Sequence, residues 1–286
     1  MDKNYRVGIV GYGVVGKAIH KLLKADVVAV YDPFLKNVGD DYGVEIGRDK
    51  SDFRDLDLVV ISVMTPTAED GSCDIDIVRD TVAWLHEIDP QVVILIKSAI
   101  PPSKIALIYG SYYTNRPLPK IVVSPEFSGE SKYFTPFWKY PDPKNMEGHG
   151  WQVFGGDKKD TSLCVDIFKR RMSVDCQFMQ TDYSTACLCK YMENSFFATK
   201  VTFCNMWFDI ATACGVDYNE LRECWLADPR INRNHTLVFP KDRGYGGKCF
   251  PKDVKAIIQE AKNNKVNVDL LEAVDKVNEG YRDGEY

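Results

Sequence analysis

The sequence predicts an α/β protein in which a doubly wound parallel sheet is followed by an all-helical domain. Through the first half of the chain, short apolar runs of strand length alternate with segments of helical periodicity, as in parallel sheets covered by helices on both faces. A glycine-rich turn joins the first apolar run to the first helix. From 182 to 214, apolar and aromatic residues follow helical spacing without proline or glycine. We therefore expect a sheet domain at 1–181 and a helical domain at 182–286.

The first strand and its turn predict a dinucleotide site. Residues 5–10 form an apolar run, and the motif Gly11-Tyr12-Gly13-Val14-Val15-Gly16 leads from it into a helix. A second strand at 27–31 ends at Asp32, about 20 residues beyond the first glycine, where a carboxylate can bind the adenosine ribose hydroxyls. A negative charge there favours NAD over NADP, whose phosphate it would repel. The alternative is a glycine-rich turn that binds nothing.

Further strands are expected at 58–63, 92–96 and 121–123, with helices at 75–88 and 103–109 between them. The loops after these strands, 64–67, 97–101 and 124–130, should line the cofactor crevice, because ligands gather at the carboxyl ends of parallel strands. The long segment 133–150 is interpreted as a surface insertion, with a substrate lid as the alternative. The predicted cofactor contacts are Gly11, Gly13, Val14, Val15, Gly16, Asp32, Thr65, Pro66, Ser98, Glu130 and Lys252.

Composition excludes several classes of protein. The 286-residue chain is 45% hydrophobic and carries a net charge of −5, which disfavours nucleic-acid partners. No signal-peptide pattern and no apolar run of membrane-spanning length is found, so we expect neither secretion nor membrane association. Nine scattered cysteines fit a reducing compartment, and the cytoplasm is predicted. Cys187 and Cys189 are spaced too closely for a Cys-x-x-Cys pair, so no metal is expected.

The segment 182–214 predicts one long helix that links the two domains. Gly215 is expected to end it in the left-handed conformation, and Asp217 with Glu220 to begin the next helix. Lys190 and Asn194 lie four residues apart, so both can donate to one oxygen, although such a pair is more often a solvated face. The same helix carries aromatic residues that predict either a dimer contact or packing within the monomer: Phe196, Phe197, Phe203, Trp207 and Phe208.

Cys249 is predicted to be a reactive thiol. It follows three glycines in Gly244-Tyr245-Gly246-Gly247-Lys248 and precedes Pro251, which suits the start of a helix. A thiol beside a helix N-terminus and near lysines favours the thiolate form. The alternative is a small buried cysteine after an ordinary turn.

Taken together, these motifs resemble the UDP-glucose/GDP-mannose dehydrogenase family. The resemblance covers nearly the whole chain, and its last motif is highly specific. It is carried by the Gly11 motif, Pro66-Thr67, Lys97-Ser98-Ala99-Ile100-Pro101, Ser124-Pro125-Glu126-Phe127, Lys190-Tyr191-Met192-Glu193-Asn194, Asp228-Pro229-Arg230-Ile231-Asn232 and Gly246-Gly247-Lys248-Cys249-Phe250-Pro251-Lys252-Asp253.

The resemblance implies a Rossmann sheet, a helical dimerisation domain, and oxidation of a nucleotide-sugar primary alcohol to a carboxylate with two NAD molecules reduced. By this analogy Cys249 attacks the intermediate aldehyde, and a thioester forms and is hydrolysed. A thiolate suits this role because it is both a good nucleophile and a good leaving group. The implied catalytic residues are Cys249, Lys190 and Asn194 at the oxyanion, Asp253 at a water or proton, and Glu126 in hydrolysis. The implied substrate contacts are Arg230, Phe127, Tyr245 and Gly246.

Two departures from the family pattern carry further expectations. Where the family has a threonine hydroxyl in its Lys-Ser-Thr-x-Pro loop, this chain has Ala99, and Ser98 is the available substitute. The family usually continues into a second doubly wound domain that grips the nucleotide, whereas this sequence stops at Tyr286, and residues 278–285 are interpreted as a frayed polar terminus. The open alternatives are a partner that supplies this domain, a different or smaller substrate, weakened catalysis, or truncation of a longer product.

Two rival functions remain at the level of sequence. A β-hydroxyacid dehydrogenase shares the sheet-plus-helices architecture and a catalytic lysine with a nearby asparagine, but needs no cysteine. A non-catalytic NAD-binding subunit would instead require a partner that carries the absent domain. Cys249 discriminates against the first rival, and turnover of a nucleotide sugar would discriminate against the second.

Overall fold

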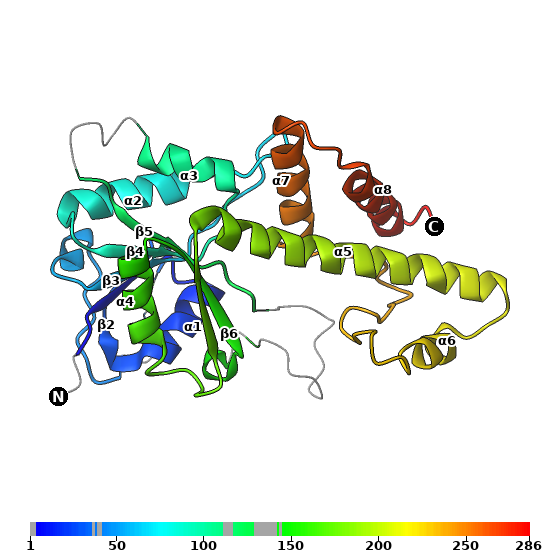
Figure 1. Cartoon of the computed structure of the whole chain (residues 1–286), viewed down its shortest axis with the longest axis horizontal. Helices are drawn as coiled ribbons and strands as arrows, with labels where there is room; N and C mark the ends of the chain where they lie inside the picture. The colour runs from blue at the N-terminus through cyan, green and yellow to red at the C-terminus, as the bar shows by residue number, and fades with distance from the viewer. Residues whose placement is uncertain (1–3, 36–37, 39–41, 111–116, 129–141, 143–144) are drawn as a thin grey trace. The chain divides into compact units, whose positions relative to one another are not determined.

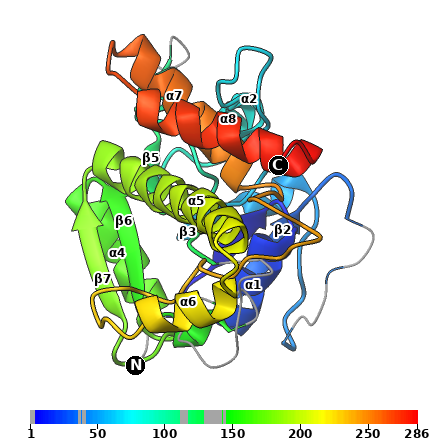
Figure 2. The ribbon, with the colours of Figure 1, turned by 90° about the vertical axis from the view of Figure 1, so that its right-hand side faces the viewer.

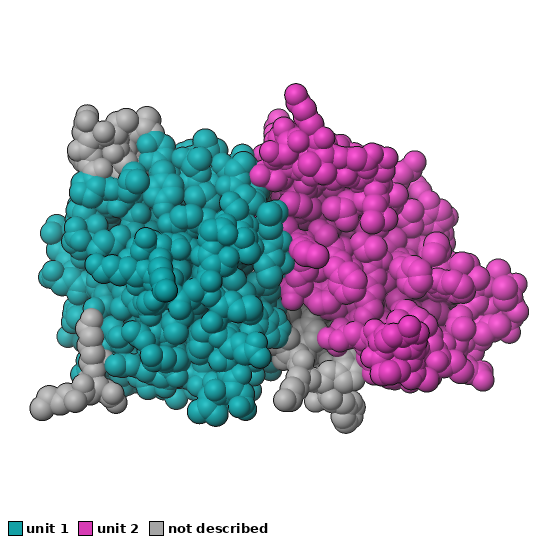
Figure 3. All heavy atoms as spheres, viewed as in Figure 1, with its two compact units in different colours: residues 1–66, 73–130, 134–190 teal, residues 67–72, 131–133, 191–286 magenta. Residues whose placement is uncertain are grey.

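The computed structural model describes residues 4–35, 38, 42–110, 117–128, 142 and 145–286. Its contacts divide the chain into two units, which Figure 3 shows in separate colours. Unit 1 holds the described residues among 1–66, 73–130 and 134–190, and unit 2 holds 67–72 and 191–286. The division therefore falls between Lys190 and Tyr191. The predicted boundary after residue 181 coincides with the end of the last strand of the sheet, Gln177–Thr181, just before the long helix begins at Tyr183.

Unit 1 is built on a seven-stranded sheet in the order β2-β1-β3-β4-β5-β6-β7. The strands are β1 (Val7–Val10), β2 (Val27–Tyr31), β3 (Leu58–Ile61), β4 (Val93–Ile96), β5 (Lys120–Val123), β6 (Trp151–Gly156) and β7 (Gln177–Thr181). The first five pair in parallel, whereas β6 runs antiparallel to β5 and β7 parallel to β6. The predicted doubly wound fold is confirmed, in a mostly parallel form.

Helices cover both faces of this sheet, with α2 and α3 on one face and α1 and α4 on the other (Figure 1). They are α1 (Val14–Leu23), α2 (Asp76–Ile88), α3 (Pro102–Tyr109) and α4 (Lys158–Phe168), with short 3₁₀ turns at Lys24–Asp26, Lys50–Phe53 and Met146–Gly148. Ile19 of α1 and Phe168 of α4 share one core with Ile9 and Leu95 of the sheet. The strands β1, β3 and β4 are buried along their whole length, which explains why their sequences are continuous apolar runs.

The sequence patterns did not predict β6, α4 or β7. The strand β6 ends in two glycines, and β7 is an exposed or half-buried edge strand of sequence QFMQT, so neither has the clear apolar pattern of the central strands. Gly155 has a packing reason, because a Cβ there would lie 2.5 Å from the Cβ of Ala186. The strand β6 joins the sheet by pairing with β5, and β7 joins it by pairing with β6, without a clear hydrophobic pattern in either strand.

Unit 2 is helical. Its elements are the continuation of α5 (Tyr183–Ala213), then α6 (Tyr218–Trp225), α7 (Phe250–Asn263) and α8 (Asp269–Asp283). Gly215 follows α5 with φ of 71°, and Asp217 caps α6 by accepting from the Asn219 N–H at 2.8 Å, as predicted. Figure 2 shows α7 and α8 side by side, and they pack on α5 through a core that includes Ala198, Val254 and Val274.

The expected frayed terminus is wrong. The helix α8 continues to Asp283, and Asn278 and Tyr281 within it are only 4% and 6% exposed. The polar residues of this segment suggested a solvated terminus, because sequence alone does not distinguish a buried asparagine whose amide is hydrogen-bonded from a solvated one.

No helix in the described ranges combines the length and the apolar character needed to cross a bilayer.

Candidate active site

The glycine-rich turn leaves open space where a dinucleotide phosphate would approach. Gly11 has φ of 87°, and a Cβ at Gly16 would lie 2.1 Å from the Gly11 carbonyl oxygen, so α1 packs closely on the turn only with glycine there. At Gly13, by contrast, a Cβ would meet nothing within 4 Å. Gly13 is also the N-cap of α1, which places the positive end of that helix at the open side. The turn therefore fits a pyrophosphate.

Asp32 lies beside this turn at the carboxyl end of β2. Its Oδ2 accepts from the Tyr12 N–H at 2.8 Å, and its Oδ1 accepts from the Phe34 N–H at 2.9 Å. Each carboxylate oxygen retains acceptor capacity, so the half-buried group fits two ribose hydroxyls. Tyr12 is anchored in turn, because its hydroxyl lies 2.6 Å from His20 Nδ1 in the core. Sequence reasoning missed this anchor.

The loops after β3 and β4 are tied to each other. Thr65 Oγ1 donates to the Ala99 carbonyl at 3.2 Å, and Ser98 Oγ donates to the Val63 carbonyl at 2.7 Å. The Ser98 hydroxyl proton is therefore committed to the backbone, which weakens the expectation that it replaces a threonine hydroxyl at position 99. Pro66 and Val14 are exposed, and Val15 is half-buried. Glu130 lies outside the described residues.

A buried ion pair follows β4 and β5. Lys97 Nζ lies 3.2 Å from Glu126 Oε2, and the Ser128 N–H donates to Glu126 Oε1 at 2.8 Å. Lys97 also donates to Ser124 and Gln152 at 3.3 and 3.4 Å. Burial alone would raise the pKa of Glu126, but the Lys97 ammonium, followed by the Ser128 hydroxyl, lowers this pKa to about 2.

Glu126 is therefore a permanent anion at neutral pH. Its partner Lys97 was not singled out by sequence, although a lysine that directly follows a buried apolar strand was an available signal.

Lys190 is 9% exposed, near the start of α5. Its Nζ lies 5.1 Å from the centroid of the Phe127 ring, which is itself buried against Val153 and Ala186. These contacts argue against a solvated lysine. Phe127 therefore supports Lys190 within unit 1, and its predicted contact with substrate stays a prediction.

Cys249 is exposed and is the N-cap of α7, as the sequence predicted. Gly247 has φ of 77°, and a Cβ there would meet nothing within 4 Å, so the chain turns in open space just before the thiol. One helical turn later, the Asp253 N–H donates to the Cys249 carbonyl at 2.9 Å. The thiol thus lies at the positive end of a helix of 14 residues.

Asn194 and Asp253 are brought together inside unit 2. Asn194 Nδ2 donates to Asp253 Oδ2 at 2.6 Å, and each residue is 2% exposed. Lys252 Nζ lies 2.6 Å from the other oxygen, Asp253 Oδ1. An amide has two hydrogens, so Asn194 can donate one to Asp253 and one to a ligand. The structure therefore links α5 to the first turn of α7 next to Cys249.

The predicted substrate residues of unit 2 have different environments. Tyr245 is 1% exposed, and its hydroxyl donates to Asp275 Oδ1 at 2.9 Å, so its side chain belongs to the core. Gly246 is half-buried beside Arg282. Arg230 has an 85% exposed side chain that forms an ion pair with Asp228. Their contacts with substrate stay predictions.

No group of three or more metal-ligating side chains is found in the part of the chain that the structure describes. All nine cysteines lie in that part, and none of them forms a disulfide there.

Comparison with known proteins places the chain among dehydrogenases. Residues 14–141 match the NAD binding domain of the UDP-glucose/GDP-mannose dehydrogenase family, and residues 184–280 match the central domain of the same family.

Curated relatives agree with these matches. The UDP-glucose 6-dehydrogenase of Rickettsia typhi is 32% identical over 230 residues, which cover 80% of this chain and 50% of that protein. The UDP-glucose 6-dehydrogenase TuaD of Bacillus subtilis is 29% identical over 277 residues, which cover 91% and 55%. The chain thus spans about half the length of the curated relatives it matches.

Solved structures share the fold. A UDP-glucose dehydrogenase from Pyrobaculum islandicum aligns with a TM-score of 0.78 at 23% identity, over 97% of this chain and 68% of that one. A UDP-D-ManNAc dehydrogenase from Pyrococcus horikoshii aligns with a TM-score of 0.77 at 19% identity, over 96% and 68%.

Proposed function

The chain belongs to the UDP-glucose/GDP-mannose dehydrogenase family, and on that premise we propose that it oxidises the primary alcohol of a nucleotide sugar to a carboxylate, with NAD as the electron acceptor. The observation that carries this proposal is Cys249, exposed at the N-terminus of α7, with the hydrogen-bonded pair Asn194 and Asp253 in the same unit. An oxidation in two steps needs a group that holds the aldehyde between them, and a thiolate can do so.

The cofactor would be held by the open glycine turn at Gly13, by Asp32 at the ribose, and by the loops that carry Thr65 and Ser98. When bound, NAD supplies the hydride acceptor for each of the two oxidations. In the proposed reaction the remaining steps are carried out by side chains of the protein, and the first of these is the Cys249 thiol. Cys249 adds to the aldehyde carbon through its sulfur while the carbonyl oxygen gains a proton, and the resulting thiohemiacetal would become a thioester by loss of its carbon-bound hydrogen as hydride and of its hydroxyl proton.

The oxyanion needs donors that are already in place. We assign this role to the Lys190 ammonium and to the second hydrogen of the Asn194 amide, which lie one turn apart on α5. Removal of one such donor usually lowers kcat by about 10² to 10³-fold. The Lys190→Ala variant should therefore lose activity by that order, and a loss below about threefold would reassign this lysine to a structural role.

Hydrolysis of the thioester breaks the carbon–sulfur bond and returns the Cys249 thiol, while water supplies the oxygen and the protons. Asp253 is proposed to position that water or to take its proton. Glu126 is proposed to act as a fixed anionic hydrogen-bond acceptor, because a carboxyl group whose pKa is about 2 takes up protons poorly at neutral pH.

We propose UDP-glucose as the first substrate to test, a homodimer formed through the exposed apolar face of α5, and a cytoplasmic location, which suits nine cysteines without disulfides. A partner chain that supplies a nucleotide-binding domain is the remaining proposed interaction.

The test is the yield of NADH when the purified chain is incubated with NAD and a panel of sugar nucleotides. Two NADH per carboxylate formed is the expected result. Cys249→Ser should stop after the first oxidation or accumulate an ester, because a hydroxyl is a poorer nucleophile and leaving group. Unchanged carboxylate production by this variant would overturn the proposal. Turnover of β-hydroxyacids instead would favour the rival dehydrogenase, and NAD binding without any turnover would favour the non-catalytic subunit.

A further inference from the structure

A buried side chain of α8, Asn278, bonds the backbone of the loop that carries Cys249. Asn278 Oδ1 accepts from the Tyr245 N–H at 2.6 Å, and Asn278 Nδ2 donates to the Tyr245 carbonyl at 3.0 Å. Asn278 is 4% exposed. One amide therefore pairs with both backbone groups of the residue four positions before Cys249, much as a neighbouring strand would. Loss of this pairing would leave a buried N–H and a buried C=O without partners.

The adjoining residues are shaped to receive this amide. Gly244 has φ of 71°, and a Cβ there would lie 2.5 Å from Asn278 Oδ1, so only glycine permits the approach. The Tyr245 ring continues into the core and ends at Asp275, one turn before Asn278 on α8. Burial, and next the nearby Asp275 carboxylate, raise the pKa of Tyr245, so its hydroxyl stays a donor.

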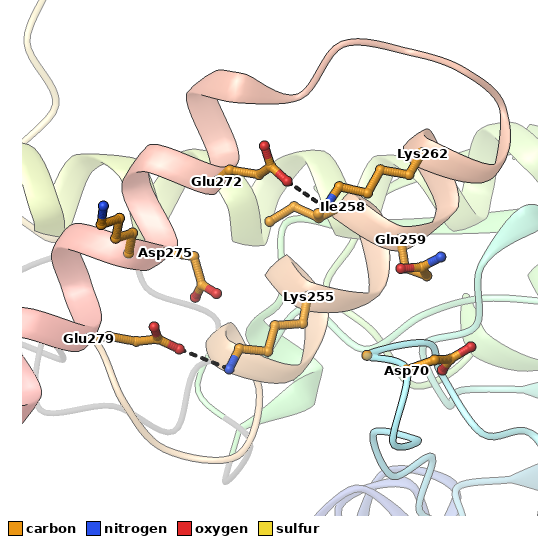
Figure 4. Close-up of a pocket in the computed structure, with 10 residues that line it drawn as sticks. Asp70, Lys255, Ile258, Gln259, Lys262, Glu272, Asp275 and Glu279 are labelled. Carbon is orange, nitrogen blue, oxygen red and sulfur yellow. Dashed lines mark hydrogen bonds and ion pairs between the residues drawn. The ribbon is translucent and has the colours of Figure 1, made fainter.

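A second attachment comes from α5. Asn205 Oδ1 accepts from Arg243 Nε at 2.7 Å and from the Gly244 N–H at 3.3 Å, and it is 1% exposed. Arg243 also bonds Asp209 at 2.8 Å, so the start of the loop is held on two helices. On the far side of the loop, α7 is joined to α8 by the ion pairs of Lys255 with Glu279 and of Lys262 with Glu272 (Figure 4).

We propose that Asn278 is a positioning residue for the Cys249 thiol. This inference rests on the proposed function only in that Cys249 is taken as the nucleophile. Residues 243–245 are fixed from α5 and α8, whereas Gly247 turns in open space. The geometry points to Asn278 as the anchor from which the glycine turn at 246–247 begins, so that it sets where the Cys249 sulfur lies relative to Asn194 and Asp253.

The first measurement is independent of dehydrogenase activity. The full chain is treated with iodoacetamide well below its unfolding temperature, and peptide mass spectrometry gives the rate at which each cysteine is alkylated. The rate for Cys249 is divided by the rate for Cys224, an exposed thiol of α6. In Asn278→Leu this ratio and its pH profile should shift by about fivefold or more, because thiolate reactivity depends on alignment with the helix N-terminus. Asn278→Asp keeps the acceptor but loses the donor, so it should show a smaller shift and covers the case in which the leucine variant fails to fold.

The matched control is Val274→Ala, one turn earlier on α8 in the same core, which destabilises unit 2 without removing either bond to Tyr245. It should leave the thiol ratio unchanged. An unchanged ratio in both Asn278 variants, or an equal shift in Val274→Ala, would overturn the proposal. Where nucleotide-sugar turnover is present, Asn278→Leu should lower kcat by about 10²-fold with the Kd for NAD unchanged. Absence of turnover in the wild type would count against the proposed function alone, because the alkylation result still stands.

Discussion

At the scale of single residues, unit 1 holds a buried ion pair beside the carboxyl ends of its strands. Lys97 and Glu126 are paired in the interior, and their neighbours Ser124, Ser128 and Gln152 supply the remaining hydrogen bonds. Removal of one partner from such a pair leaves an uncompensated buried charge, which commonly costs about 3–5 kcal/mol. The pair therefore keeps Glu126 ionised, and it also makes the stability of the fold sensitive to mutation of either residue and to acid.

The acid sensitivity of Glu126 can be measured. Folding lowers the pKa of Glu126 from 4.5 to about 2, so the charged carboxylate contributes stability above pH 4.5, and this contribution is lost as the pH falls from 4.5 toward 2. The full effect is about 3 kcal/mol. In urea unfolding between pH 5 and pH 3, Glu126→Gln should be less stable at pH 5 and should lose less stability on acidification than the wild type. Parallel pH curves would contradict the assignment.

A second group acts in a higher pH window. His235 stacks on Phe197 with ring centroids 4.2 Å apart, and burial, followed by the Lys200 ammonium, lowers the pKa of His235 from 6.5 to about 4. Above pH 6.5 this histidine is neutral in both the folded and the unfolded state, and as the pH falls toward 4 only the unfolded state gains the proton. Stability should fall by about 3 kcal/mol over that window. His235→Asn, which tolerates the positive φ of 61°, should remove this slope in urea titrations from pH 7 to pH 4.5.

The residue types at the site could be predicted from sequence more fully than their surroundings. Cys249, Asn194 and Asp253 were found because each stands in a distinctive local motif, and the structure places them in one unit. The contacts of Asn278 and Asn205 and the ion pair of Lys97 were not predicted, because each joins groups about 30 to 40 residues apart in sequence. The hydrogen-bond partner of a buried polar side chain can be identified only once the fold has brought the two groups together.

At the scale of elements, the turn from β1 into α1 assigns its glycines two different tasks. Gly16 allows the helix to approach the turn, whereas Gly13 faces open space at the helix N-terminus. The same residue type is therefore structural at one position and accessible to ligand at the other.

Two alanine substitutions should separate these tasks. Gly16→Ala would place its Cβ 2.1 Å from a backbone oxygen, so we expect lower thermal stability together with loss of NAD binding. Gly13→Ala meets nothing within 4 Å in the protein, so its melting temperature should stay close to that of the wild type while its affinity for NAD falls about tenfold or more. Calorimetric titration and thermal melts would check both outcomes. Full NAD affinity in Gly13→Ala would move the phosphate site elsewhere.

At the scale of the whole molecule, the aromatic residues of α5 divide between the core and the surface. Phe197 and Phe208 are half-buried and pack on His235 and Tyr218. Phe196, Phe203 and Trp207 are 61%, 42% and 39% exposed. Packing within the monomer therefore accounts for only part of the aromatic set that the sequence offered as a dimer contact, and the exposed part fits the proposed homodimer.

Self-association should depend on that exposed part. We expect Trp207→Glu to shift sedimentation velocity from dimer to monomer at micromolar concentration, because a charge at the centre of an apolar interface costs several kcal/mol. Leu107→Glu on α3, where the wild-type side chain is 52% exposed, provides the matched control and should leave the association state unchanged. A wild-type chain that sediments as a monomer would remove the dimer proposal.

The sequence by itself determined the class of fold, the cofactor turn and the place of an exposed cysteine, Cys249, at the start of a helix. These follow from local signals: apolar runs that are buried on both faces, glycines required by backbone geometry, and a cysteine before a helix. Only the tertiary structure decided that β6 and β7 extend the sheet, that Glu126 is paired with a buried lysine, and that the buried Asn278 bonds the backbone of the loop that leads to Cys249. The reason is physical. A polar residue looks the same in sequence whether its hydrogen bonds are made with water or with a distant backbone group, and only the folded structure shows which of these partners it has.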